Sequence, residues 1–149
     1  MDVRRELPLW LEANQRPTWD EYFKELVLLT SKRSACNKLA VGCILVKDNR
    51  IISQGYNGYL SGLPHIPIIR HGHNIGTIHA EQNAIIDCAK RGVSCEGSIA
   101  YITHYPCLNC FKFLQAGGIK EINYINDYNN DTEVVNLSKL TNININKLN

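Results

Sequence analysis

The sequence has no apolar run approaching the roughly 20 residues that cross a membrane as a helix. Its first ten residues, MDVRRELPLW, also lack the apolar core of a secretory signal peptide. We therefore expect a protein with no membrane partner and a cytoplasmic location, which is the host cytosol if the protein is viral.

An excess of charge of one sign is also missing. The chain has 16 basic and 14 acidic side chains, which gives a net charge of +2 over 149 residues. Proteins that bind nucleic acids through phosphates usually carry a strongly basic patch, so we expect no nucleic-acid partner and a small-molecule substrate. The length predicts one domain over residues 1–149, with its core at about 17–128 and an asparagine-rich tail at 129–149.

Six cysteines stand at positions 36, 43, 88, 95, 107 and 110. In a short secreted chain they would suggest a disulfide framework, but without a secretion signal we expect reduced thiols. Cys43 lies in the apolar run AVGCILV, and Cys88 has apolar neighbours on a predicted helix. We predict that these two cysteines are small buried hydrophobic residues.

Turn residues and apolar spacing predict alternating strands and helices through the second half of the chain. Thr18 and Glu21 match a capping box at a helix start, and Gly92 and Gly117 match helix ends. We expect a helix from residue 18 to 30, a hairpin of strands 41–46 and 50–54, an irregular loop over 59–78, a helix over 80–91, a strand over 98–103, a helix over 107–115, a strand over 121–126 and a short helix over 131–139 before a weak strand. Right-handed crossovers then predict an α/β fold with a mainly parallel sheet and helices on both faces.

Two short motifs indicate a catalytic zinc site. The first is His79-Ala80-Glu81, and the second is the PCLNC segment that contains Cys107 and Cys110. One imidazole and two thiolates fill three corners of a zinc tetrahedron and leave the fourth open for water. Glu81 is two residues from the histidine, where a carboxylate can exchange protons with that water without being a ligand. The combination H-x-E with P-C-x-x-C is typical of zinc nucleobase deaminases.

Further segments extend the pattern beyond the metal motifs. They are WDEYF at 19–23, KRS at 32–34, VG at 41–42, GYNG at 55–58, TIHAEQNAI at 77–85 and YPCLNC at 105–110. Over about residues 17–128 the chain resembles the deoxycytidylate (dCMP) deaminases, and it is similar to the bacterial branch that includes the competence-operon enzymes. The resemblance implies the cytidine deaminase-like fold, a three-layer α/β/α sandwich with a mixed, mostly parallel central sheet.

The resemblance also implies a reaction. The chain would be a hydrolase of pyrimidine nucleotide metabolism that converts dCMP and water to dUMP and ammonia, which supplies the precursor of dTMP. His79, Cys107 and Cys110 would hold one Zn²⁺. Water activated there would attack C4 of cytosine, and Glu81 would be the catalytic residue that passes the proton to N3.

Three residues are expected near the base and sugar by the same resemblance. Asn57, at the end of the second strand, would bind the sugar hydroxyls, and the backbone amide of Ala80 would hold the base carbonyl. Tyr105 would pack against the base or the sugar, because an aromatic ring offers a flat face to a planar ligand.

For the phosphate, the candidates are Arg33, Ser34 and Tyr128. A guanidinium group forms bidentate hydrogen bonds to phosphate, and the two hydroxyl groups are further donors. An arginine at a helix end is more often a solvated charge or a partner of the helix dipole, so this alternative stays open for Arg33.

Some members of this family hold a second, structural zinc. Cys36 matches one ligand of that site, and the loop before His79 presents His65, His71 and His73 in place of a cysteine. The alternative for these histidines is that they are exposed polar residues of a loop. We expect His104 to be a packing residue at the end of a strand.

Many relatives are hexamers that dCTP activates and dTTP inhibits. The resemblance therefore implies a homo-oligomer, with a hexamer as the expected form, and allosteric control by these nucleotides near the GYNG segment. Two alternatives to the dCMP reaction stay open. The chain could deaminate another cytosine nucleotide, dCTP or deoxycytidine, or it could be a structural zinc-binding module whose metal has a fourth protein ligand and no activity.

Overall fold

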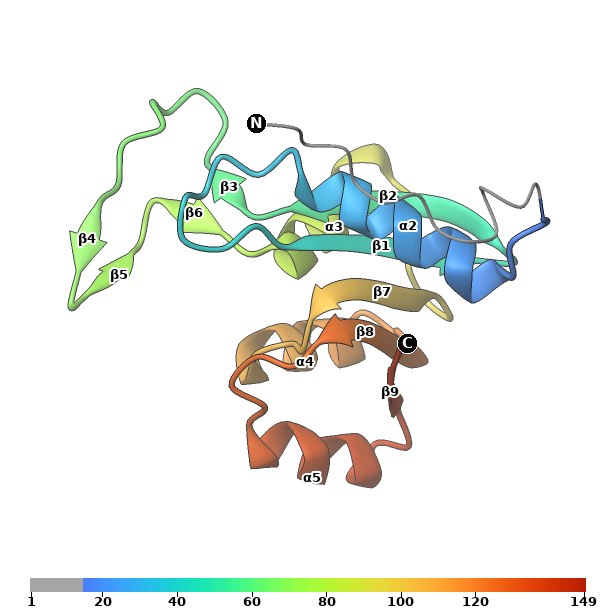
Figure 1. The fold of residues 1–149 in the computed structure, drawn as a ribbon. Coiled ribbons are helices and arrows are strands. Elements are labelled where there is room, and N and C mark those ends of the chain that lie inside the picture. The colour runs from blue at the N-terminus through green and yellow to red at the C-terminus, as the bar shows by residue number, and fades with distance from the viewer. Residues whose placement is uncertain (1–14) are drawn as a thin grey trace.

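A central sheet of five strands organises the computed structural model, which describes residues 15–149 (Figure 1). The spatial order is β2-β1-β7-β8-β9. The strands are β1 (Gly42–Lys47), β2 (Arg50–Tyr56), β7 (Ile99–His104), β8 (Glu121–Asn126) and β9 (Asn144–Lys147). Strand β1 is antiparallel to both β2 and β7, whereas β7, β8 and β9 are mutually parallel neighbours. Within this five-stranded sheet, every strand except β1 therefore runs in one direction, and the expected mixed, mostly parallel sheet is confirmed.

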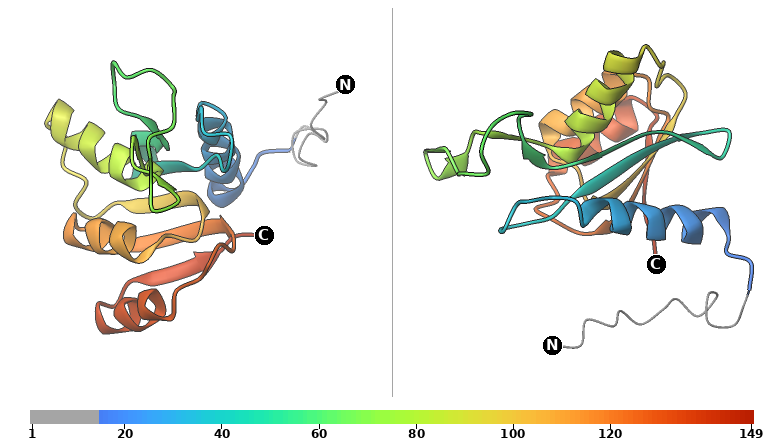
Figure 2. Two further views of the ribbon diagram at one scale, coloured as in Figure 1. Left: turned by 90° about the vertical axis from the view of Figure 1, so that its left-hand side faces the viewer. Right: turned by 90° about the horizontal axis from the view of Figure 1, so that it is seen from above.

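Helices cover both faces of this sheet, as Figure 2 shows. Helix α2 (Trp19–Ser31) lies on one face, over β1 and β7. The opposite face carries α3 (Ala80–Arg91), α4 (Leu108–Ala116) and α5 (Thr132–Leu140). The predicted three-layer α/β/α sandwich is confirmed. None of the helices within residues 15–149 is long and apolar enough to span a membrane.

The hydrophobic core has two parts, one on each face of the sheet, and alternate side chains of a strand belong to different parts. In β1, Cys43 and Leu45 pack with α3 and α4, while Ile44 and Val46 pack with Phe23 of α2. Successive side chains of a strand point to opposite faces, so a strand that is covered on both sides reads as an unbroken apolar run. The run AVGCILV is such a strand, and the predicted burial of Cys43 is confirmed.

Local signals set the helix ends. The Thr18 backbone N–H donates to Glu21 Oε1 at 2.9 Å, and the Glu21 N–H donates to Thr18 Oγ1 at 3.1 Å, so the capping box is formed. Gly92 ends α3 with φ 69°, a left-handed conformation that favours glycine. The expected helix over 80–91 is confirmed at both ends. The helix expected from residue 107 begins one residue later, because Cys107 is its N-cap.

The long loop before His79 forms an arm that projects from the body of the protein (Figure 1). It contains two ladders of two residues each, where β3 (Gly58–Tyr59) pairs with β6 (Thr77–Ile78) and β4 (Ile69–Arg70) pairs with β5 (His73–Asn74). We refer to residues 59–78 as the arm. Such short strands leave no periodicity in a sequence, so only the irregular character of the segment was predictable.

The asparagine-rich tail completes the same sheet. Helix α5 and strand β9 confirm the expected short helix and weak final strand. Asn146 Nδ2 donates to Glu121 Oε1 at 2.9 Å and to Asn123 Oδ1 at 3.1 Å across the β8–β9 pair. These side-chain bonds stabilise a polar edge strand that has little apolar surface to bury.

Candidate active site

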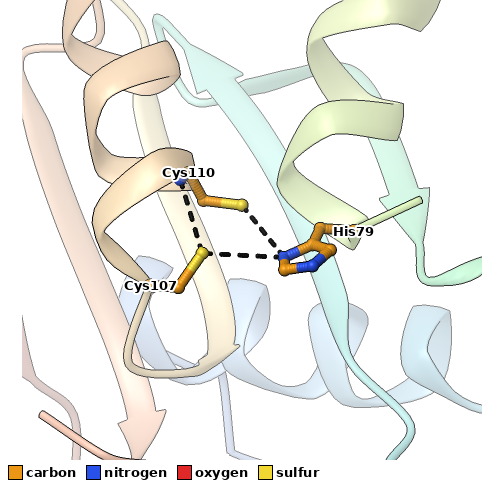
Figure 3. Close-up of side chains that lie close together, drawn as sticks. All are labelled: His79, Cys107 and Cys110. Atoms are coloured by element: carbon orange, nitrogen blue, oxygen red, sulfur yellow. Dashed lines mark hydrogen bonds between the residues drawn. The ribbon is translucent and has the colours of Figure 1, made fainter. Parts of the chain in front are cut away.

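Two helix starts carry the predicted metal ligands. His79 is the N-cap of α3, and Cys107 is the N-cap of α4 with Cys110 in the first turn of that helix. The Cys110 backbone N–H points at Cys107 Sγ at 3.5 Å. Figure 3 shows the three side chains pointing toward one another. A motif on one helix thus meets a motif on another because both helices begin at the same edge of the fold.

The spacing of the three donor atoms fits a zinc ion. His79 Nδ1 lies 3.3 Å from Cys110 Sγ and 3.7 Å from Cys107 Sγ, and the three ligand atoms all lie within 4.8 Å of one another. Zinc bonds of about 2.0–2.1 Å to nitrogen and about 2.3 Å to sulfur place tetrahedral N and S ligands about 3.6 Å apart. Among the described residues, the three donors thus fill three corners of a zinc tetrahedron and leave the fourth open.

The ionisation of the two cysteines also favours a bound cation. Hydrogen bonding from the Cys110 thiol, with help from His79, lowers the pKa of Cys107 to about 4. The hydrogen bond to Cys107, burial and the nearby charge of Glu81 raise the pKa of Cys110 well above its usual value. A second thiolate is thus disfavoured beside the first, and a divalent cation is the group that lets both cysteines ionise.

Glu81 lies in the first turn of α3, next to the metal ligands. Its side chain is 4% exposed and lines the same pocket as His79 and Cys107. Burial raises the pKa of its carboxyl group, although a hydrogen bond from Cys110 acts in the opposite direction. A buried carboxyl group of this kind can both accept and return a proton near neutral pH.

The pocket has a volume of about 200 Å³. Most of the residues that we predicted to contact a ligand line this pocket. They come from the end of β2, the start of α3 and the segments after β7 and β8. The predicted residues that line it are Asn57, His79, Ala80, Glu81, Tyr105, Cys107 and Tyr128. Cys110 is fully buried behind them.

Asn57 is held in place by its own amide group. Oδ1 accepts the Val41 N–H at 2.8 Å, and Nδ2 donates to the Leu39 carbonyl at 2.7 Å. An amide has two donor hydrogens and an oxygen with two lone pairs, so one donor and one acceptor remain for a ligand. Leu39 and Val41 themselves line the pocket, and Asn57 therefore shapes the wall as well as facing the ligand.

The two pocket tyrosines differ in exposure. Tyr105 is 6% exposed and packs edge-to-face on Tyr124 with ring centroids 5.0 Å apart, whereas Tyr128 is 46% exposed. A buried ring can support a base or sugar, and an exposed hydroxyl suits a group that stays partly hydrated. The pocket is thus closed at Glu81 and open at Tyr128.

Arg33 and Ser34 do not line this pocket. Ser34 Oγ donates to the Asn57 carbonyl at 2.7 Å, and the Arg33 guanidinium carbon lies 5.8 Å from the centre of the Tyr56 ring. Ser34 therefore positions Asn57, and its hydroxyl hydrogen is already used. Arg33 makes a cation–π contact with the Tyr56 ring. A role for Arg33 in binding phosphate stays a prediction.

The second metal site suggested by the resemblance stays a prediction. Within residues 15–149, His79, Cys107 and Cys110 form the only group of three metal-ligating atoms that come together. Of the arm histidines, His65 stacks on Tyr59 with ring centroids 5.2 Å apart, and His71 lies in the turn between β4 and β5 at φ 50°. These two histidines and His73 form no such group with Cys36 among the described residues.

The pocket also contains residues that we did not predict, among them Thr77, Ile78 and His104. Burial lowers the pKa of His104, whose ring lies edge-to-face on Tyr128 at 5.9 Å. Our prediction of a packing residue was incomplete, since the ring faces the ligand space as well. The available signal was its place at the carboxyl end of a parallel strand, the edge where α/β proteins bind ligands.

Comparisons with known proteins agree with this geometry. Residues 17–126 match the model of the cytidine and deoxycytidylate deaminase zinc-binding region. ComE operon protein 2 of Bacillus subtilis is 42% identical over 118 residues, which are 76% of this chain and 62% of that protein. Deoxycytidylate deaminase of Schizosaccharomyces pombe is 37% identical over 134 residues, 82% of this chain and 41% of that protein. The chain therefore spans less than two thirds of these two relatives.

A solved structure gives a more complete match. The dCMP deaminase from the cyanophage S-TIM5, in complex with dCMP and dUMP, is 32% identical with a TM-score of 0.80, and the match covers 90% of this chain and 99% of that one. The cytidine deaminase-like fold is thereby confirmed. With its zinc-binding region matched along most of its length, this chain belongs to the cytidine and deoxycytidylate deaminase family.

Proposed function

We propose that this protein is a zinc-dependent dCMP deaminase that converts dCMP and water to dUMP and ammonia. The observation that carries the proposal is the meeting of His79, Cys107 and Cys110 with the buried Glu81 at one pocket. The cyanophage relative was solved with dCMP and dUMP, and relatives from yeasts to mammals are named deoxycytidylate deaminase. These names support dCMP over other cytosine nucleotides.

The zinc ligands and Glu81 have separate roles in the proposed reaction. Zinc held by His79, Cys107 and Cys110 supplies, when bound, the Lewis acid that makes water nucleophilic near neutral pH. Glu81 accepts a proton as the new C–O bond forms at C4 and donates it to N3 of the base. A second proton passes through Glu81 to the amino group, which leaves as ammonia when its bond to C4 breaks.

The pocket also explains how the nucleotide would be oriented. The Ala80 N–H is at the start of α3, where backbone donors have no partner within the helix, and it is directed to the base carbonyl. Asn57 keeps one free donor and one free acceptor for the sugar hydroxyls, and Tyr105 supports the base or sugar from a buried position. The phosphate then lies on the open side, near Tyr128.

Further properties come from the family resemblance. We propose one catalytic zinc ion per chain, with a second, structural zinc as an open alternative. We also propose a homo-oligomer with the hexamer as its expected form, activation by dCTP and inhibition by dTTP. A cytoplasmic enzyme that supplies the dTMP precursor is consistent with this set. Exposed aliphatic side chains on the arm support contact between subunits, and they are Leu60, Leu63, Ile66, Ile68, Ile69 and Ile75.

Ammonia release by zinc-loaded protein tests the proposal. The substrates are dCMP, dCTP, deoxycytidine and CMP, each with and without added dCTP and dTTP. We expect a preference for dCMP, with an effect of the two triphosphates. Turnover of dCTP or deoxycytidine alone would keep the zinc chemistry and refute the substrate, and bound zinc without turnover of any of the four would favour the structural zinc module.

A further inference from the structure

His104 lies in the pocket without a role in the chemistry proposed above. It is the last residue of β7, it is half-buried, and its ring packs edge-to-face on Tyr128. The same pocket contains Glu81. What the imidazole offers a ligand depends on which ring nitrogen carries the proton.

The hydrogen bonds of Thr103 indicate which ring nitrogen of His104 carries the proton. Thr103 is 1% exposed, its Oγ1 accepts the Gly42 N–H at 3.1 Å, and the same oxygen lies 2.8 Å from His104 Nδ1. Within the described part of the chain, this nitrogen is the only acceptor available to the Thr103 hydroxyl hydrogen. A buried hydroxyl group without an acceptor is costly, so Thr103 donates to Nδ1, and the ring proton is on Nε2.

This chain of hydrogen bonds begins in the tightly packed core. A Cβ atom on Gly42 would lie 2.6 Å from the Val27 carbonyl oxygen and 2.8 Å from the Ser31 nitrogen, both in α2. The backbone of β1 is therefore pressed against α2, and the Gly42 N–H has a fixed direction. Burial lowers the pKa of His104, which agrees with a neutral ring whose Nε2–H is its one donor.

We propose that His104 determines specificity by donating its Nε2–H, beside the Tyr128 hydroxyl, to an oxygen of the substrate's phosphate. This inference rests on the proposed function. Glu81 is 4% exposed and Tyr128 is 46% exposed, so the base lies at the Glu81 end and the partly hydrated phosphate at the Tyr128 end. His104 packs on Tyr128, which places its donor at the phosphate end.

Two substitutions and two substrates test the role in selectivity. His104→Leu removes the donor, and His104→Gln places an amide N–H near the position of Nε2. For His104→Leu we expect the ratio of kcat/KM for dCMP to that for deoxycytidine to fall about 10- to 100-fold, mostly through KM for dCMP. We expect His104→Gln to recover most of that ratio at equal zinc content.

Equal losses on dCMP and deoxycytidine, or no loss on either, would overturn the phosphate assignment. If the wild-type protein does not deaminate dCMP, the proposed function itself fails, and that result is obtained before any variant is made. The two failures are therefore distinguishable.

Nitrogen NMR of the zinc-loaded protein tests the tautomer without measuring activity. With ¹⁵N-labelled histidine, the His104 signals are those that disappear in His104→Gln. We expect Nε2 to be protonated and Nδ1 to carry no proton in the wild type and in Thr103→Ser, and we expect the Nδ1 signal to shift in Thr103→Val, which lacks the hydroxyl group. A proton on Nδ1 of the wild type would refute the arrangement, even if Thr103→Val does not fold.

Discussion

Asn57 accepts the backbone N–H of Val41 through its side-chain oxygen at 2.8 Å, which joins the end of β2 to the segment before β1. The same amide donates to the Leu39 carbonyl. Asn57, which is predicted to bind the sugar, thus also stabilises the pocket wall through these two hydrogen bonds. Substitutions of Asn57 are therefore expected to affect both ligand binding and stability.

We expect Asn57→Asp to lower both activity and stability. The carboxylate keeps the acceptor for Val41 but replaces a donor by a negative charge opposite the Leu39 carbonyl. The unfolding free energy should fall by about 1–3 kcal/mol, as measured by urea denaturation. Ser34→Ala removes the bond to the Asn57 carbonyl and the acceptor of the Cys36 N–H, and it should cost about 1–2 kcal/mol. Equal stability of Asn57→Asp and the wild type would contradict the bracing role.

We expect Glu81→Gln to retain zinc and lose turnover. The amide has nearly the same shape as the carboxyl group but cannot accept a proton, so kcat should fall about 10²- to 10⁴-fold. Zinc content by atomic absorption and ammonia release on the same sample give the two readings. Turnover within a few-fold of the wild type would exclude Glu81 as the proton carrier.

We expect Cys107→Ala to lose both zinc and activity, because the site keeps only two of its three ligands. Cys95→Ala is the matched control, since Cys95 is a half-buried thiol that contacts the Gly117 carbonyl, outside the pocket. The control should bind one zinc per chain. Addition of a chelator should lower the melting temperature of the control but not of Cys107→Ala, because zinc stabilises only the chain that binds it.

We expect Asp87→Asn to destabilise the protein at neutral pH but not in acid. Both carboxylate oxygens of Asp87 accept from Arg91, at 3.0 Å and 2.6 Å, and this interaction lowers the Asp87 pKa below its usual 3.8. A lowered pKa in the folded state contributes stability that is present above the unfolded pKa and is lost as the pH falls through the folded one.

The expected loss for Asp87→Asn is about 0.5–1 kcal/mol at pH 7, since the pair is partly exposed. It should decrease as the pH falls and disappear once the pH is below the lowered pKa of Asp87. Urea denaturation at several pH values, with Arg91→Ala and the double variant, isolates the pair. A loss that stays constant with pH would argue against the ion pair.

We expect Ile66→Lys and Ile69→Lys to weaken assembly. These side chains are 64% and 62% exposed on the arm, and a charge would oppose their burial between subunits. Leu140→Lys is the control, because Leu140 is 80% exposed at the end of α5. Mass photometry should show a smaller species for the arm variants only. An unchanged distribution for all three would exclude the arm as the interface.

Local signals were enough to predict much of this protein. Helix α3 has the bounds that its apolar spacing and Gly92 indicate, and the ligands of the zinc site follow from two short motifs. The second metal site stays a prediction, because ligand spacing along an irregular loop says nothing of where its residues point. The same limit applies to Arg33 and Ser34, whose motif does not reveal that Ser34 holds Asn57.

The sequence by itself determined the helices, their caps and the alternation of buried residues along β1, since each depends on residues within a few positions of one another. It also indicated the zinc donors, because each of the two motifs that carry them is short and local. Only the tertiary structure decided which side chains share the pocket. The tautomer of His104 depends on Thr103 and, through it, on an N–H 61 residues earlier at Gly42. Such a relationship arises when β1 pairs with β7 and packs on α2, and packing of distant segments is not encoded in any local pattern.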